Sequence, residues 1–198
     1  MRPAFLALWG LDFAFADVVA TSSDPNLGAI RLAWWRERLD ELDEGKSAPA
    51  EPRLCAVERN LIARGIEGKN LSPLEDAWLP LLAPFPWGAD AAEGLKLRGG
   101  ILFGIGADLL GCPREDAARA GAIWSLADGA EHCSDPASRE MLLSEARALL
   151  KQDRLKIAPK ARPLTVLAAL AAVDVAGKGN LARGTSAVRH RLFGTFPR

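Results

Sequence analysis

The chain has 198 residues, 49% of them hydrophobic, and its 25 basic and 25 acidic side chains give a formal net charge of zero. This composition argues against a disordered chain, and the length suffices for one domain with a substantial core. The three cysteines are odd in number, widely spaced and without a CxxC pair, which argues against a disulfide framework and a structural zinc site and favours a reducing compartment.

The first predicted helix covers residues 3–20 and is strongly apolar. The opening stretch resembles a signal peptide in hydropathy, but its basic region is one arginine, and Asp12 and Asp17 interrupt the apolar part. The later apolar stretch "PLTVLAALAAVDVAG" is too short for an ordinary membrane span and contains Asp174. We therefore expect a cytoplasmic protein without a transmembrane helix.

The second predicted helix, residues 25–44, begins with a capping signal, because Ser23 and Asp24 precede Pro25. Two apolar faces follow from its spacing, and we expect both to be packed. The first face consists of Leu32, Trp35, Leu39 and Leu42, and the second of Leu27, Ile30 and Trp34. We predict that Trp34 and Trp35 are core anchors; the alternative is that they form a pocket wall.

Further helices are predicted for the rest of the chain, separated by short breaks rich in Gly, Pro, Ser and Asp. Their ranges are 52–65, 72–83, 89–111, 114–132, 136–152, 162–176 and 185–193. Sustained alternation of apolar and polar residues is lacking, and no long linker divides the chain. The sequence predicts one all-α domain over residues 1–198.

The predicted helix 89–111 is apolar on more than one side and contains Gly99, Gly100, Gly104 and Gly106. Glycine lowers helix propensity, so its presence calls for compensation by a close helix crossing or by room for a bound group. We favour the close crossing.

The last quarter of the chain is basic, since residues 151–198 hold ten Lys or Arg against Asp153 and Asp174. This charge either neutralises the acidic remainder or attracts phosphate, anionic lipid or an acidic partner. Phe193 and Phe196 are interleaved with Arg191 and Arg198, which is typical of a membrane-surface or partner-binding face; docking on the helical bundle is the alternative. We find no nucleic-acid-binding motif.

Four stretches follow one another in a recognisable order. The most specific is "DPNLGAIRLAWWRERL", residues 24–39, after an aromatic-rich helix. The others are "LRGGILFGIGADLLG", "AARAGAIWSLADGAEH" and "TSAVRHRLFGTF". In this order they resemble the squalene/phytoene synthase family, particularly its bacterial and mitochondrial branch. The resemblance implies the all-α isoprenoid synthase bundle and the magnesium-dependent condensation of two prenyl diphosphates, with two aspartate-rich motifs holding the metal.

This sequence departs from both acidic motifs. In the first, only Asp17 falls within the motif, and Asp12 lies five residues away, which places the two carboxylates in different directions on a helix. In the second, "SLADGAEHCSDP", Asp128 and Glu131 remain as metal candidates, while His132 is a poor magnesium ligand. We regard Asp17, Asp128 and Glu131 as vestigial candidates and expect no cofactor, or magnesium if the chain is active.

Further differences from the family also argue against catalysis. Relative to the family, the chain is shortened at its N-terminus and after the second motif, and it has no tyrosine. Rival catalytic sites are weak: His190 lies in a basic stretch typical of a solvated helix surface, and a pair of Cys133 with a histidine lacks support.

Two functions follow from the resemblance. The first is a family member that has lost catalysis and acts as a binding or assembly scaffold, like the mitochondrial relatives implicated in complex I assembly. Its partner is then a protein, or a hydrophobic isoprenoid or lipid. The second is a magnesium-dependent prenyltransferase that condenses prenyl diphosphates in isoprenoid biosynthesis.

Overall fold

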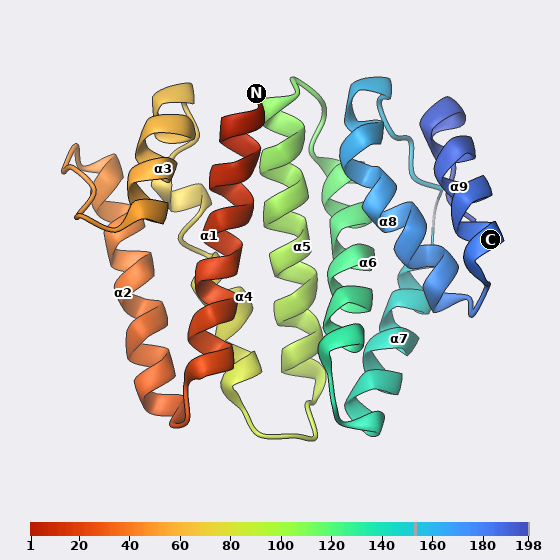
Figure 1. Ribbon diagram of the computed structural model, residues 1–198, viewed down its shortest axis with the longest axis horizontal. Helices are drawn as coiled ribbons and strands as arrows, with labels where there is room; N and C mark the ends of the chain where they lie inside the picture. Colours follow the sequence, from red (N-terminus) through yellow and green to blue (C-terminus); the bar gives the residue numbers. More distant parts are fainter. Residues whose placement is uncertain (153, 198) are drawn as a thin grey trace. The chain divides into compact units, whose positions relative to one another are not determined.

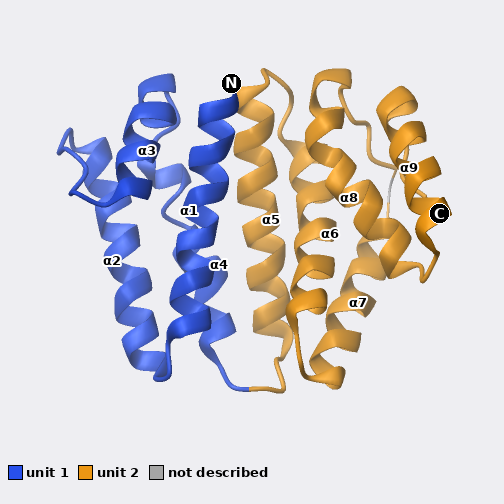
Figure 2. Ribbon diagram, viewed as in Figure 1, with its two compact units in different colours: residues 1–84 blue, residues 85–198 orange. Residues whose placement is uncertain are grey.

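The computed structural model describes residues 1–152 and 154–197, and within them it has nine α-helices and no strand (Figure 1). The helical content is 76%. The all-α prediction is therefore confirmed. The chain forms two compact units, residues 1–84 and 85–198 (Figure 2).

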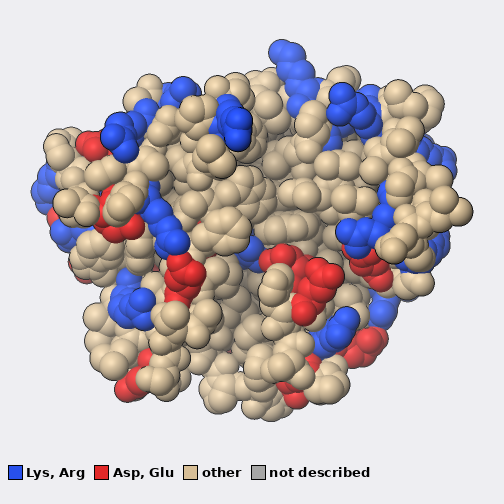
Figure 3. Space-filling model, viewed as in Figure 1, with Lys and Arg blue, Asp and Glu red and all other residues tan. Residues whose placement is uncertain are grey.

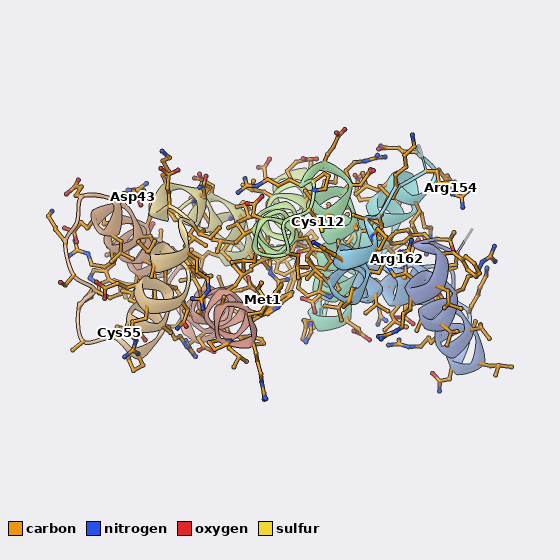
Figure 4. All side chains as sticks on the ribbon, turned by 90° about the horizontal axis from the view of Figure 1, so that it is seen from above. Met1, Asp43, Cys55, Cys112, Arg154 and Arg162 are labelled. Atoms are coloured by element: carbon orange, nitrogen blue, oxygen red, sulfur yellow. The ribbon has the colours of Figure 1, made fainter. Side chains whose placement is uncertain are left out.

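Unit 1 is built from four α-helices and three 3₁₀ turns. The helices are α1 (Arg2–Thr21), α2 (Pro25–Asp43), α3 (Pro52–Asn60) and α4 (Leu74–Trp78), and the turns are η1 (Ile62–Arg64), η2 (Gly68–Asn70) and η3 (Leu79–Leu82). The Asp24 side chain accepts from the Asn26 amide, which confirms the predicted start of α2. Asp43, labelled in Figure 4, accepts from the amides of Gly68 and Lys69 and so joins the end of α2 to η2.

Helix α1 supplies much of the core of unit 1, including the fully buried side chains of Leu8, Leu11 and Phe15. Its buried Asp12 accepts a hydrogen bond of 3.1 Å from the indole Nε1 of Trp78. Among the described residues, α1 is the one helix whose length and composition would allow it to cross a membrane, and 44% of its most apolar window is buried.

Helix α2 packs on one of the two predicted faces. Leu32 and Leu39 are fully buried, whereas Leu27 and Ile30 are 59% and 66% exposed. The prediction of a second packed face is wrong for this helix. Apolar spacing defines which side chains share a face, but a face is buried only where another element covers it.

Unit 2 holds five α-helices and one 3₁₀ turn. They are α5 (Ala89–Leu109), α6 (Glu115–His132), α7 (Pro136–Leu150), η4 (Pro159–Ala161), α8 (Arg162–Val175) and α9 (Asn180–Phe193). Helix α6 is central, because it contacts α5, α7 and α8, and α9 packs on α8 (Figure 1). Helix α9 begins five residues earlier than predicted.

A close helix crossing in unit 2 joins Gly99 of α5 to Gly121 of α6. A Cβ atom on either glycine would overlap the backbone of the other. Only glycine permits this approach, so the close crossing that we favoured for the glycine-rich helix is confirmed at Gly99.

His190 corrects a second prediction, because its side chain is fully buried rather than solvated. Its Nε2 lies 2.9 Å from the Thr165 hydroxyl of α8, and its Nδ1 lies 3.1 Å from the Thr195 carbonyl oxygen. The Phe196 ring packs edge-on against the imidazole with centroids 5.0 Å apart. Burial lowers the pKa of His190 and the charge of Arg162 lowers it further, although the hydrogen bond to Thr195 acts in the opposite direction.

The glycine crossing predicts opposite effects for two alanine substitutions in α5 and α6. Gly121→Ala should destabilise the protein by about 1–3 kcal/mol, because the new methyl group must displace the α5 backbone. Gly104→Ala is the control, since its Cβ would lie 4.0 Å from the Ala118 Cβ, an ordinary contact. Better helix propensity should make this variant as stable as the parent or more stable by up to about 1 kcal/mol. Urea unfolding measures both, and equal effects would contradict the crossing.

The buried imidazole predicts a pH-dependent stability. The unfolded chain binds a proton at His190 near pH 6.5, whereas the folded chain does so only at lower pH. The contribution of the neutral imidazole to stability should therefore be fully present above about pH 7 and decrease below pH 6.5, with a slope of at most about 1.4 kcal/mol per pH unit. Urea unfolding of the parent and of His190→Gln between pH 5 and 8 measures this slope. Identical slopes for the two proteins would contradict the prediction.

Candidate functional site

The first acidic candidate, Asp17, lies on α1 in an exposed ion pair. Its carboxylate is 2.7 Å from the guanidinium of Arg53 on α3, and its side chain is 60% exposed. Asp12 is buried on the other side of the same helix, as the five-residue spacing predicts. Unit 1 therefore presents a single carboxylate at this position, already neutralised by an arginine.

The second acidic candidate, Asp128, lies on α6 and pairs with a buried arginine of α5. Arg98 Nη1 is 2.7 Å from Asp128 Oδ2, and the Arg98 side chain is 6% exposed. The same nitrogen donates to the Ser125 hydroxyl at 3.4 Å. The Arg98 guanidinium carbon lies 4.7 Å from the ring centroid of Trp124. Arg98 is thus held by a charge, a hydroxyl and an aromatic face.

The polar residues near Asp128 have separate local roles. Glu131 is exposed. His132 lies on the surface, and its Nδ1 is 2.8 Å from the backbone oxygen of Asp128. Asp135 caps α7 by accepting from the amide and the hydroxyl of Ser138, and these bonds lower the pKa of the Asp135 carboxyl. Within residues 1–152 and 154–197, no three His, Cys, Asp or Glu side chains form a group that could hold a metal ion.

A cavity of about 210 Å³ adjoins the second acidic candidates. Its walls come from α6, α7, α8 and the first turn of α9, and they include both Asp128 and Glu131. Arg139 also lines it, as do Asp174 and Arg183, which pair through two contacts of 2.6 Å. Charges of both signs therefore meet in a space smaller than the roughly 300–1,000 Å³ typical of ligand pockets.

The two adjacent tryptophans have different environments. Trp35 is 8% exposed and packs on Phe15 of α1, with ring centroids 6.0 Å apart. Trp34 is 39% exposed and lies edge-on to Trp35 at 5.4 Å. The core-anchor prediction is confirmed for Trp35 and wrong for Trp34. Trp34 belongs to the exposed face of α2, which no other element of unit 1 covers.

The three cysteines are free, as the lack of a CxxC pair predicts. Cys133 donates to the backbone oxygen of Asp135 at 3.4 Å, so its thiol is engaged by the backbone. Cys55 and Cys112, labelled in Figure 4, lie in different units.

Sequence reasoning missed Arg98 as a functional residue. It stands in the apolar stretch "GLKLRGGILFGIG", and a buried arginine almost always has an acidic partner. That signal predicts a partner but does not identify Asp128, which lies thirty residues away on another helix. Comparisons with protein-family models, curated proteins and solved structures gave no match.

The Arg98–Asp128 pair predicts a large loss of stability when one partner is removed. Arg98→Leu should cost about 3 kcal/mol, because it leaves a half-buried carboxylate without its counter-charge. The double variant Arg98→Leu/Asp128→Leu should recover much of that loss.

The control for this test is Arg114→Leu, which removes an arginine from the surface pair with Asp108. Its cost should stay below about 1 kcal/mol. Urea unfolding of the four proteins provides the comparison. A loss for Arg98→Leu no larger than that of the control would show that the buried pair does not support the fold.

Proposed function

We propose that this chain is a non-catalytic member of the squalene/phytoene synthase family that acts as a helical binding or assembly scaffold. The family assignment rests on the ordered sequence resemblance, and the loss of catalysis rests on the buried ion pair between Arg98 and Asp128. The partner in this proposal is a protein, or a hydrophobic isoprenoid or lipid, and the protein acts in the cytoplasm.

The ion pair bears on catalysis because it places a permanent cation at the second acidic position. Arginine stays charged at any physiological pH. A magnesium ion bound to the Asp128 carboxylate would lie close to the buried guanidinium, and repulsion between the two cations is strong away from bulk water. Asp128 therefore serves as the counter-charge of Arg98, a role that leaves little capacity for metal.

The first acidic position does not offer an alternative magnesium site. Magnesium prefers six oxygen ligands in octahedral geometry and usually takes at least one or two carboxylates from a protein. Asp17 is a single carboxylate, exposed to solvent and paired with Arg53. Helix α1 thus offers no second carboxylate on the face of Asp17, whereas the prenyltransferase reaction requires a pair on one helix face.

One observation favours the second candidate function, a magnesium-dependent prenyltransferase. Glu131 is exposed and lines the same cavity as Asp128, so two carboxylates one turn apart border one space. If both bound one ion, Arg98 would have to release Asp128. Titration with a diphosphate ligand and magnesium separates the two functions.

The test is isothermal titration with a non-hydrolysable farnesyl diphosphate analogue, with and without magnesium. We expect no magnesium-dependent heat and no magnesium-dependent rise in Tm, because a ligand that binds only the folded state must raise its stability. The variants Asp17→Ala, Asp128→Ala and Glu131→Ala should likewise show no magnesium-dependent binding, although Asp128→Ala should lower the Tm in all conditions because it leaves the buried Arg98 without its counter-charge. Glu37→Ala, at an exposed glutamate of α2, serves as the control.

Magnesium-dependent binding that Asp128→Ala and Glu131→Ala abolish, and that Glu37→Ala leaves intact, would overturn the proposal. This result would favour the prenyltransferase function, which an assay of product formation would then test.

A further inference from the structure

Helix α9 has an unusual distribution of side chains, with polar residues inside and apolar residues outside. Ser186 and His190 are buried against α8, where Ser186 donates to the Ala169 carbonyl oxygen at 3.3 Å. Leu181, Val188 and Leu192 point away from the unit and are 86%, 60% and 59% exposed. A helix that served only to cover α8 would have the reverse pattern.

The exposed apolar residues form one continuous stripe. Leu181, Val188 and Leu192 are spaced by seven and four residues, so they lie on the same side of the helix. With Thr185 and Phe193 they line an open groove of about 520 Å³. Phe193, at the C-terminal end of α9, is 68% exposed. We call Leu181, Val188, Leu192 and Phe193 the outer stripe of α9.

Two arginines flank the outer stripe. By helical periodicity Arg189 and Arg191 lie on opposite sides of the line through Val188 and Leu192. Helix α9 contains no acidic residue. Within residues 1–152 and 154–197 neither arginine side chain has an ion-pair partner, whereas Arg183 is neutralised by Asp174. In Figure 3 basic side chains lie over the part of unit 2 that holds α8 and α9.

Arg189 also lines a cavity suited to an anion. This cavity measures about 430 Å³ and brings Arg189 and Arg154 to one space, with apolar walls from Leu149, Leu155 and Phe196. Arg154 is labelled in Figure 4. Of the described residues that line it, none is acidic. Guanidinium groups bind phosphate oxygens through paired hydrogen bonds, so the cavity fits a phosphate group beside the apolar stripe.

The outer stripe is held in a fixed position. Arg162 Nη1 at the start of α8 donates to the backbone oxygens of Arg191 and Leu192, at 3.3 and 2.6 Å. The hydrogen bonds of His190 to Thr165 and Thr195 hold the same end of α9 in place. The apolar groups and the arginines therefore face outward together, ordered before any partner binds.

We propose that α9 docks the protein on the surface of an anionic lipid membrane. The outer stripe enters the boundary between headgroups and acyl chains, and Arg189 and Arg191 contact lipid phosphates, with one headgroup reaching the Arg154–Arg189 cavity. A second copy of the chain is disfavoured as the occupant, because a two-fold contact along the stripe would place these arginines against their own copies. This inference does not depend on whether catalysis survives.

The test is flotation with vesicles of phosphatidylcholine alone and of phosphatidylcholine mixed with phosphatidylglycerol. We expect binding to the mixed vesicles and little binding to the neutral ones. At 1 M salt the Debye length falls to about 3 Å, so binding to the mixed vesicles should weaken strongly. Inorganic phosphate, added at matched ionic strength, should not release the protein from the mixed vesicles, because a free phosphate ion cannot bury the outer stripe.

Two double variants separate the apolar and the electrostatic contributions. Leu181→Ser/Leu192→Ser should weaken binding about tenfold or more, since the membrane-bound protein no longer buries these two leucines among the lipids. Arg189→Gln/Arg191→Gln should weaken it about tenfold or more, at about fivefold per arginine.

The matched controls are Leu27→Ser/Ile30→Ser on the exposed face of α2 and Arg59→Gln/Arg64→Gln near the end of α3. They remove two exposed aliphatic side chains and two arginine charges elsewhere. The controls should bind like the parent, and circular dichroism confirms that each variant is folded. Absence of parental binding to the mixed vesicles, or equal losses in variants and controls, would overturn the proposal. A dimer that the leucine variant disperses, without vesicle binding, would assign the stripe to a second copy instead.

Discussion

The crossing of α5 and α6 at Gly99 and Gly121 is the constraint on which unit 2 depends. Because neither residue carries a Cβ atom, the two backbones meet directly, and the residues next to the crossing are placed within reach of the other helix. Arg98 precedes Gly99 and therefore reaches Ser125 and Asp128 on α6. Without the close approach its charge would be buried without a partner, at a cost of several kcal/mol.

This arrangement links the packing of unit 2 to the proposed loss of catalysis. The partly buried carboxylate of Asp128 needs a counter-charge, and here a basic side chain of the adjacent helix supplies it. The stacking of Phe103 on Trp124, with centroids 5.5 Å apart, encloses the same region and keeps the guanidinium away from bulk water. In our proposal a position that binds metal in active relatives has become part of the scaffold.

The fold class, most helix bounds and the Asp24 cap were predictable, because they follow from local spacing and from side chains that bond to their own backbone. The wrong predictions concern which face of a helix is buried, and not where the helices lie in the sequence. Trp34 was predicted to be buried and His190 exposed, yet burial depends on which neighbour covers a face. Arg98 was missed as a functional residue for the same reason, since its partner lies on another helix. Asp17, Asp128 and Glu131 were identified from a motif, while the ion pairs of Asp17 and Asp128 required the structure.

The central claim, that Arg98 rather than a metal ion neutralises Asp128, can be tested directly by nuclear magnetic resonance. Manganese replaces magnesium at oxygen sites, and its unpaired electrons broaden the signals of nearby amides. Titration of the labelled protein with manganese should leave the amides of α6 around Asp128 and Glu131 no broader than those of exposed acidic residues elsewhere. Selective broadening centred on Asp128 at low metal concentration would contradict the account and identify a metal site where we infer an ion pair.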